Sequence, residues 1–79
     1  MEDLLILEYP KDGVRLYDNR IEYSDRGLRT ALAISHISDL ALGYKKVLVN
    51  VGDRRHWITL RRKDDAEELF TAACLLIGR

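Results

Sequence analysis

The sequence has little of the residues that build disulfide frameworks or zinc clusters. Cys74 is the only cysteine and Pro10 the only proline among its 79 residues. A single thiol excludes an intramolecular disulfide framework and a cysteine-rich zinc site. Because Cys74 lies between Ala73 and Leu75, we expect it to act as a small buried hydrophobic residue and not as a nucleophile.

The chain also lacks a long hydrophobic run and an excess of charge of either sign. Its apolar stretch Leu4–Leu7 is four residues long, which is too short for a signal peptide or a membrane span. Thirteen basic residues balance thirteen acidic ones, so net charge gives no general reason to expect nucleic-acid or membrane binding. We therefore expect a cytoplasmic protein without a transmembrane segment.

Residue patterns that support catalysis are equally scarce. His36 and His56 are the only histidines and do not have metal-ligand spacing. Ser35 and Ser38 neighbour His36 in the sequence, but neighbours of this kind do not make a catalytic triad. The glycines are isolated and form no phosphate-binding loop. The sequence therefore predicts no enzyme activity, no metal site and no cofactor.

The residues that are present form short strand-like segments separated by turn residues, in a globular composition that is 47% apolar and 33% charged. Residues 1–79 are expected to form one small domain. The predicted strands are Leu4–Tyr9, Val14–Tyr17, Ile21–Tyr23, Leu28–Ile34, Leu40–Tyr44, Val47–Val51 and His56–Arg61. The spacing within Ala31–Leu42 also fits a helix, but Gly43 and the β-branched run after it favour a turn near His36–Asp39 between two strands.

One amphipathic helix is predicted over Asp64–Ile77. Asp64 is a suitable N-cap, and Glu67 three residues later completes a capping box. At 100° per residue an apolar stripe forms, flanked by Leu76 and Cys74, whereas Leu75 points away from it. The stripe consists of Ala66, Leu69, Phe70, Ala73 and Ile77.

Seven strands followed by one C-terminal helix resemble the pleckstrin-homology (PH) superfold, especially the small bacterial PH-like domains. The resemblance covers roughly Val14 to Ile77. It is carried by the hairpin Arg15–Tyr23, the Ile34–Leu40 stretch, Ile58-Thr59-Leu60 and the helix start Asp64–Leu69. It implies an α+β, mainly-β fold: a bent antiparallel sheet or open barrel of seven strands, or two near-orthogonal sheets, with the helix capping one end. It also implies a non-catalytic scaffold that binds proteins, peptides or lipid headgroups.

The chain departs from the lipid-binding members of that family. Those members carry several basic residues around the first hairpin loop. This chain has only Lys11 and Arg15 there, on either side of Asp12. The departure argues against phosphoinositide binding.

The segment Arg54–Lys63 has five basic residues and no acidic one. Strand alternation places Ile58 and Leu60 in the core, and Arg55, Trp57, Thr59 and Arg61 on the opposite face. Such a stripe can stack on a planar group and pair with a phosphate or carboxylate. In the alternative interpretation, Trp57 covers the sheet while the arginines pair with Asp53, Glu67 or Glu68. The predicted ligand- or partner-binding residues are Arg54, Arg55, Trp57, Arg61 and Lys63.

Two functions from different classes remain open. The first is a non-enzymatic binding module that engages a protein partner or itself. A homodimer would form through a sheet edge or the Leu75 side of the helix. The alternative is a binder of a small ligand or nucleic acid, recognising a phosphate or nucleotide through the Trp57 and arginine stripe.

Overall fold

The computed structural model describes residues 3–78, so residues 1, 2 and 79 of the predicted domain lie outside the described part. Within it the chain is mainly β structure followed by one α-helix. The strands are β1 (Leu5–Tyr9), β2 (Val14–Tyr17), β3 (Arg20–Asp25), β4 (Leu28–Ala33), β5 (Asp39–Gly43), β6 (Lys46–Val51) and β7 (Arg54–Thr59). The helix is α1 (Lys63–Ile77), and a single 3₁₀ turn, η1 (Ile34–His36), separates β4 from β5.

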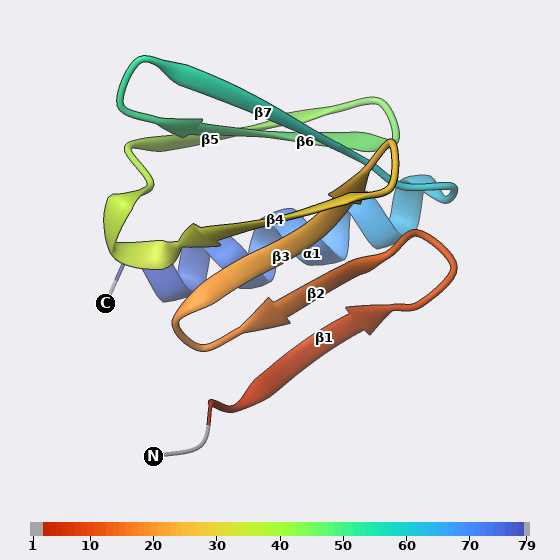
Figure 1. Ribbon diagram of the computed structural model, residues 1–79, viewed down its shortest axis with the longest axis horizontal. Helices are drawn as coiled ribbons and strands as arrows, with labels where there is room; N and C mark the ends of the chain where they lie inside the picture. Colours follow the sequence, from red (N-terminus) through yellow and green to blue (C-terminus); the bar gives the residue numbers. More distant parts are fainter. Residues whose placement is uncertain (1–2, 79) are drawn as a thin grey trace.

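The strands form two antiparallel sheets, of order β1-β2-β3-β4 and β5-β6-β7 (Figure 1). The predicted α+β, mainly-β class is confirmed for residues 3–78, as is the single C-terminal helix. Since η1 interrupts the chain between β4 and β5, the preference for strand, turn and strand over a helix through Ala31–Leu42 is also confirmed.

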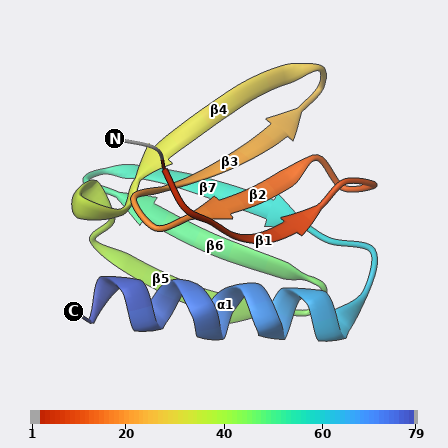
Figure 2. The ribbon, with the colours of Figure 1, turned by 90° about the horizontal axis from the view of Figure 1, so that it is seen from below.

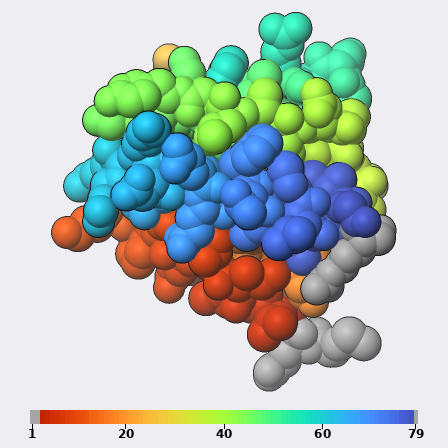
Figure 3. All heavy atoms as spheres, turned by 180° about the vertical axis from the view of Figure 1, so that it is seen from behind, coloured from red at the N-terminus to blue at the C-terminus, as the bar shows by residue number. Residues whose placement is uncertain are grey.

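The helix and both sheets enclose one hydrophobic core. Figure 2 shows α1 running beneath the sheets. Figure 3 shows the helix, in blue, between the green β5–β6 region on one side and β1, in red, on the other. Burial of apolar side chains is the main favourable contribution to folding a domain of this size. The fully buried side chains come from both sheets and the segment after β7: Val14, Leu16, Ile21, Val47, Val49, Ile58 and Leu60. From α1 they are joined by Ala66, Leu69 and Ala73.

The buried stripe of α1 is rotated relative to the prediction. Leu76 is buried, whereas Phe70 and Ile77 are half-buried. Cys74 is exposed, so its predicted burial was wrong. The reason is that the buried arc is centred between Leu69 and Ala73, and Cys74 lies outside that arc at 100° from Ala73.

The predicted helix start was also wrong by a position. The helix begins at Lys63, and the N-cap is Arg62, whose side chain makes no capping hydrogen bond. The N–H of Ala66 donates to the carbonyl of Arg62 at 3.2 Å. Asp64 and Asp65 therefore lie inside the first turn, where their negative charge interacts favourably with the helix dipole.

The turn between β1 and β2 requires glycine for two reasons. Gly13 has φ = +69°, which is costly for a residue with a side chain. A Cβ at this position would also lie 3.1 Å from the side chain of Ser24, in β3. This close approach fixes the position of the β1–β2 turn against β3.

A hydrogen bond links the two sheets. The Tyr23 hydroxyl, on β3, lies 2.8 Å from Nδ1 of His56, on β7.

Because the pair is partly buried, Tyr23→Phe is expected to lower the free energy of unfolding by about 1 kcal/mol, measured by urea denaturation. The exposed Tyr44 provides the control, since Tyr44→Phe should leave stability unchanged. Equal losses in the two variants would contradict a stabilising link.

Candidate functional site

The outer face of the three-stranded sheet carries the exposed tryptophan. The strand register aligns Ala41, Leu48 and Trp57 in one row across β5, β6 and β7. The neighbouring rows place Asp39 and Asn50 beside Arg55, and Lys46 beside Thr59. We call this surface the Trp57 face, defined by Asp39, Ala41, Lys46, Leu48, Asn50, Arg55, Trp57 and Thr59. It presents a central apolar row between two polar rows.

Trp57 remains half exposed although it lies in the middle of a strand. Its relative exposure is 50%. The ammonium nitrogen of Lys46 lies 4.7 Å from the centroid of the indole ring, a cation–π contact. The open indole continues the row of Ala41 and Leu48, and tryptophan is enriched at protein interfaces.

Arg55 adds positive charge to the Trp57 face, whereas alternation along β7 places Arg54 on the opposite face of the strand. Both side chains are exposed. Within residues 3–78 neither arginine has a carboxylate within salt-bridge distance. In the described part of the chain these two arginines are therefore not paired with carboxylates, contrary to the alternative interpretation. Their guanidinium groups are available to a partner.

The other two predicted site residues lie away from the Trp57 face and have acidic partners. Strand β7 ends at Thr59, and Nε of Arg61 lies 3.6 Å from the Asp12 carboxylate, in the β1–β2 turn. Lys63 lies 4.0 Å from Glu67, one helical turn along α1. The structure thus brings Arg55 and Trp57 together and places Arg61 and Lys63 at the start of the helix.

Four basic side chains gather near that helix start. Lys45, Arg61, Arg62 and Lys63 surround an open hollow of about 300 Å³, with Asp64 as the one acidic residue lining it. The N–H of Leu60 donates to the carbonyl of Lys45 at 2.8 Å. This bond holds the β5–β6 turn against the β7–α1 loop. Lys45 was not among the predicted site residues, because its approach to Arg61 depends on strand register.

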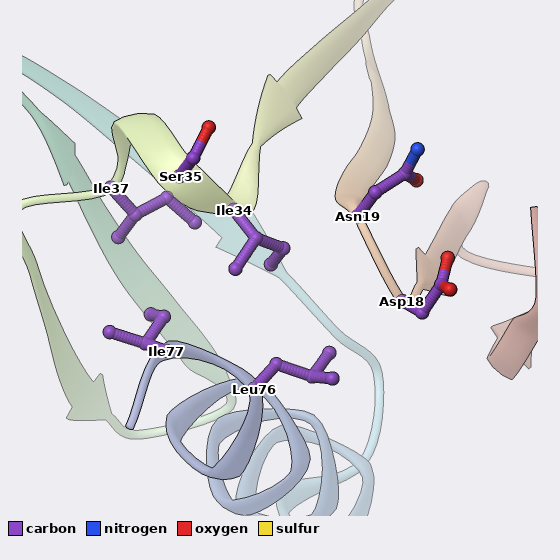
Figure 4. A pocket seen from close by; sticks show the side chains of 7 residues that line it. All are labelled: Asp18, Asn19, Ile34, Ser35, Ile37, Leu76 and Ile77. Atoms are coloured by element: carbon purple, nitrogen blue, oxygen red, sulfur yellow. The ribbon is translucent and has the colours of Figure 1, made fainter. Parts of the chain in front are cut away.

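A notch with a mixed polar and apolar lining lies at the opposite end of α1 (Figure 4). It has a volume of about 410 Å³. Ile34 and Ile37, around η1, face Leu76 and Ile77 at the end of the helix, while Asp18, Asn19 and Ser35 complete the lining (Figure 4). The notch contains no group that is both titratable and buried. It can receive an apolar side chain against the isoleucines and Leu76.

The main electrostatic network lies on the four-stranded sheet. Arg20 stacks on the Tyr17 ring at 3.9 Å and bonds to Glu22 at 2.7 Å and to Asp3. Arg29 reaches the other oxygen of Glu22 at 3.1 Å. The hydrogen bond from Arg20 holds the pKa of the Glu22 carboxyl below its ordinary value. These contacts link β3 to β4 and to the chain before β1.

Metal-binding and membrane-spanning features are not found in the described residues. Between residues 3 and 78, no group of three or more His, Cys, Asp or Glu side chains is placed to hold a metal ion. His36 is exposed, and His56 is engaged with Tyr23. In the same part of the chain, no helix has the length and apolarity needed to cross a membrane.

Comparison of the chain with protein families, with curated proteins and with solved structures finds no match. The function must therefore be argued from the surfaces of the molecule.

Proposed function

We propose that this protein is a non-enzymatic binding module that recognises a protein partner through the Trp57 face. The observation that carries the proposal is the half-exposed Trp57 on the edge strand β7, which shares its face with Arg55, an arginine without a salt-bridge partner in residues 3–78. Tryptophan and arginine are the residue types that dominate binding energy at protein interfaces. Two sheets followed by one helix also agree with what the resemblance to PH-like domains implies, and such domains serve as binding scaffolds.

The charge of the Trp57 face selects the kind of partner. Lys46 contacts the indole and Arg55 lies on the same face, which carries Asp39 as its one acidic residue. A complementary surface would therefore offer carboxylates around an apolar residue. The apolar row of Ala41, Leu48 and Trp57 would then be covered, while the basic groups pair at the rim.

The test begins with co-purification of partners from the native host, with and without nuclease, followed by affinity measurement with the purified partner. Trp57→Ala is expected to weaken binding by about tenfold or more. Leu28, on β4, is the matched control, because it is also a large exposed apolar residue and lies on the other sheet. Leu28→Ala should change the affinity by less than about twofold. A folded Trp57→Ala variant that binds the partner as tightly as the wild type would refute the proposal.

A second candidate function is recognition of a phosphate-containing ligand or nucleic acid. It is favoured by the hollow lined by Lys45, Arg61, Arg62 and Lys63. Arg61→Lys keeps the charge but loses bidentate geometry, so it should weaken a phosphate complex. Higher salt should weaken it steeply if the ligand is a polyanion. A complex that survives nuclease and is indifferent to Arg61→Lys would exclude this second function.

A further inference from the structure

A second surface, distinct from the Trp57 face, lies between β1 and α1. Figure 3 shows β1, in red, beside the blue helix on this side of the molecule. A groove of about 470 Å³ separates them. Leu7 of β1 and Ala72 and Leu75 of α1 provide its apolar lining.

Strand β1 leaves one edge of its backbone open. It pairs with β2 on one side, and within residues 3–78 no strand pairs with its other side. The N–H and C=O groups along such an edge can accept an additional strand. A strand added there would continue the four-stranded sheet next to the groove.

The exposed leucine of the helix lies where side chains of that added strand would pack. Leu75 has a relative exposure of 71%, although it lines the same groove as the half-buried Leu7 and Ala72. Alternate residues of a strand point to one face of a sheet. Every second side chain of an added strand would therefore face α1, where Leu75 and Ala72 offer an apolar contact.

The acidic residues of the groove specify the charge of its occupant. Asp64, Glu67 and Glu68 line it, and Lys63 is the basic residue near Glu67, at 4.0 Å. The Tyr9 hydroxyl donates to Glu68 at 2.6 Å, which holds this carboxylate close to β1. The groove thus has an excess of negative charge beside an open strand edge.

We propose that this groove binds a basic, extended segment of a partner protein, which adds as a strand to the edge of β1. Its apolar side chains pack on Leu75 and Ala72, and its lysine or arginine residues pair with the acidic groups. A second copy of the chain is a poorer occupant, because two-fold pairing of β1 edges would bring two sets of these acids together. The preferred charge is opposite to that of the Trp57 face, so the two surfaces can be tested separately.

The test uses a phage-displayed library of short random peptides, selected on the wild-type protein and counter-selected on Leu75→Lys. Enriched peptides are expected to carry lysine or arginine and to alternate apolar residues. A synthetic enriched peptide should bind at least about tenfold more weakly to Leu75→Lys and to Glu67→Lys. Leu28→Lys is the matched control, since Leu28, at 73% exposure, is equally open but lies on β4. It should bind normally, as should Trp57→Ala.

Strand addition predicts two further results. Methylation of backbone nitrogens at alternate peptide residues should abolish binding in one register and spare it in the other. Amide chemical shifts should change in β1 and α1 and remain constant in β5, β6 and β7.

Several results would overturn the proposal. These are the enrichment of no basic peptide, equal tolerance of methylation in both registers, or shifts confined to the three-stranded sheet. A dimer detected by sedimentation and dissociated by Leu75→Lys would assign the groove to a second copy of the chain. None of these results would decide whether the Trp57 face binds its own partner.

Discussion

Replacing Leu69 by alanine is expected to lower the free energy of unfolding by about 2–5 kcal/mol. Leu69 is fully buried, with 0% relative exposure, at the centre of the helix face that packs on the sheets. The substitution removes apolar contacts and leaves a cavity that the close-packed core can fill only in part. A chain of 79 residues has a total stability of about 4–12 kcal/mol, so this one change could unfold a large share of the molecules.

Leu75 provides the matched control for this prediction, because it is the same residue type on the same helix. It is exposed, so Leu75→Ala should change the free energy of unfolding by less than about 0.5 kcal/mol. Urea denaturation followed by circular dichroism measures both variants. Phe70 is only half-buried. Phe70→Ala should therefore lower the free energy of unfolding by less than is typical of a core phenylalanine, which is about 3–5 kcal/mol. Equal losses for Leu69→Ala and Leu75→Ala would show that the helix packs through another face.

The strand pattern could be predicted from the sequence where the alternation of apolar residues marks the buried face of a strand. In β6, Val47 and Val49 alternate with more exposed residues, and both are fully buried. Likewise Ile58 and Leu60 are buried while Trp57 faces outward. Alternation of this kind is a local property of the chain, and short turns between the strands preserve it.

The start and rotation of the helix depend on contacts outside the helix. A capping box at Asp64 and Glu67 satisfied the sequence rules, yet Arg62 is the N-cap. The preceding chain is fixed by the buried Leu60, whose N–H bonds to Lys45 at 2.8 Å. The position at which α1 starts therefore depends on contact with the β5–β6 turn. A capping motif within the helix sequence does not include that contact.

The candidate surfaces were predictable only in part. Alternation placed Arg55 and Trp57 on one face, but the contact of Lys46 with the indole requires the register between β6 and β7. The ion pair of Arg61 with Asp12 joins segments that are far apart in the sequence. The groove between β1 and α1 likewise joins the two ends of the described chain. Each of these features arises from tertiary packing, which leaves no local pattern in the sequence.

Alkaline pH is expected to destabilise the protein through Tyr9. This residue is buried on β1, and its hydroxyl donates to the Glu68 carboxylate on α1 at 2.6 Å. Burial, and next the hydrogen bond to Glu68, raise the pKa of the Tyr9 phenol above its ordinary value. The folded state therefore keeps a proton that the unfolded state releases near about pH 10.

The sign of the pH dependence follows from this difference in bound protons. Below about pH 10 both states hold the phenol proton, and the contribution of Tyr9 to stability is fully present. Above that pH the unfolded state binds fewer protons, so the free energy of unfolding falls by about 1.4 kcal/mol per pH unit until the folded phenol itself ionises. Tyr9→Phe has no such proton to lose. Its stability should be lower than that of the wild type at neutral pH, and the difference should shrink as the pH rises.

Urea denaturation of both proteins from about pH 8 to about pH 11 separates this effect from the titration of lysines, which the two proteins share. Tyr44→Phe, at an exposed position, is the control and should follow the wild-type curve throughout. A constant difference between wild type and Tyr9→Phe across this range would mean that the folded phenol ionises as easily as a solvated one. The bond between β1 and α1 would then be too weak to hold Glu68 beside the edge of β1, and the acidic lining of the groove would lose its fixed geometry.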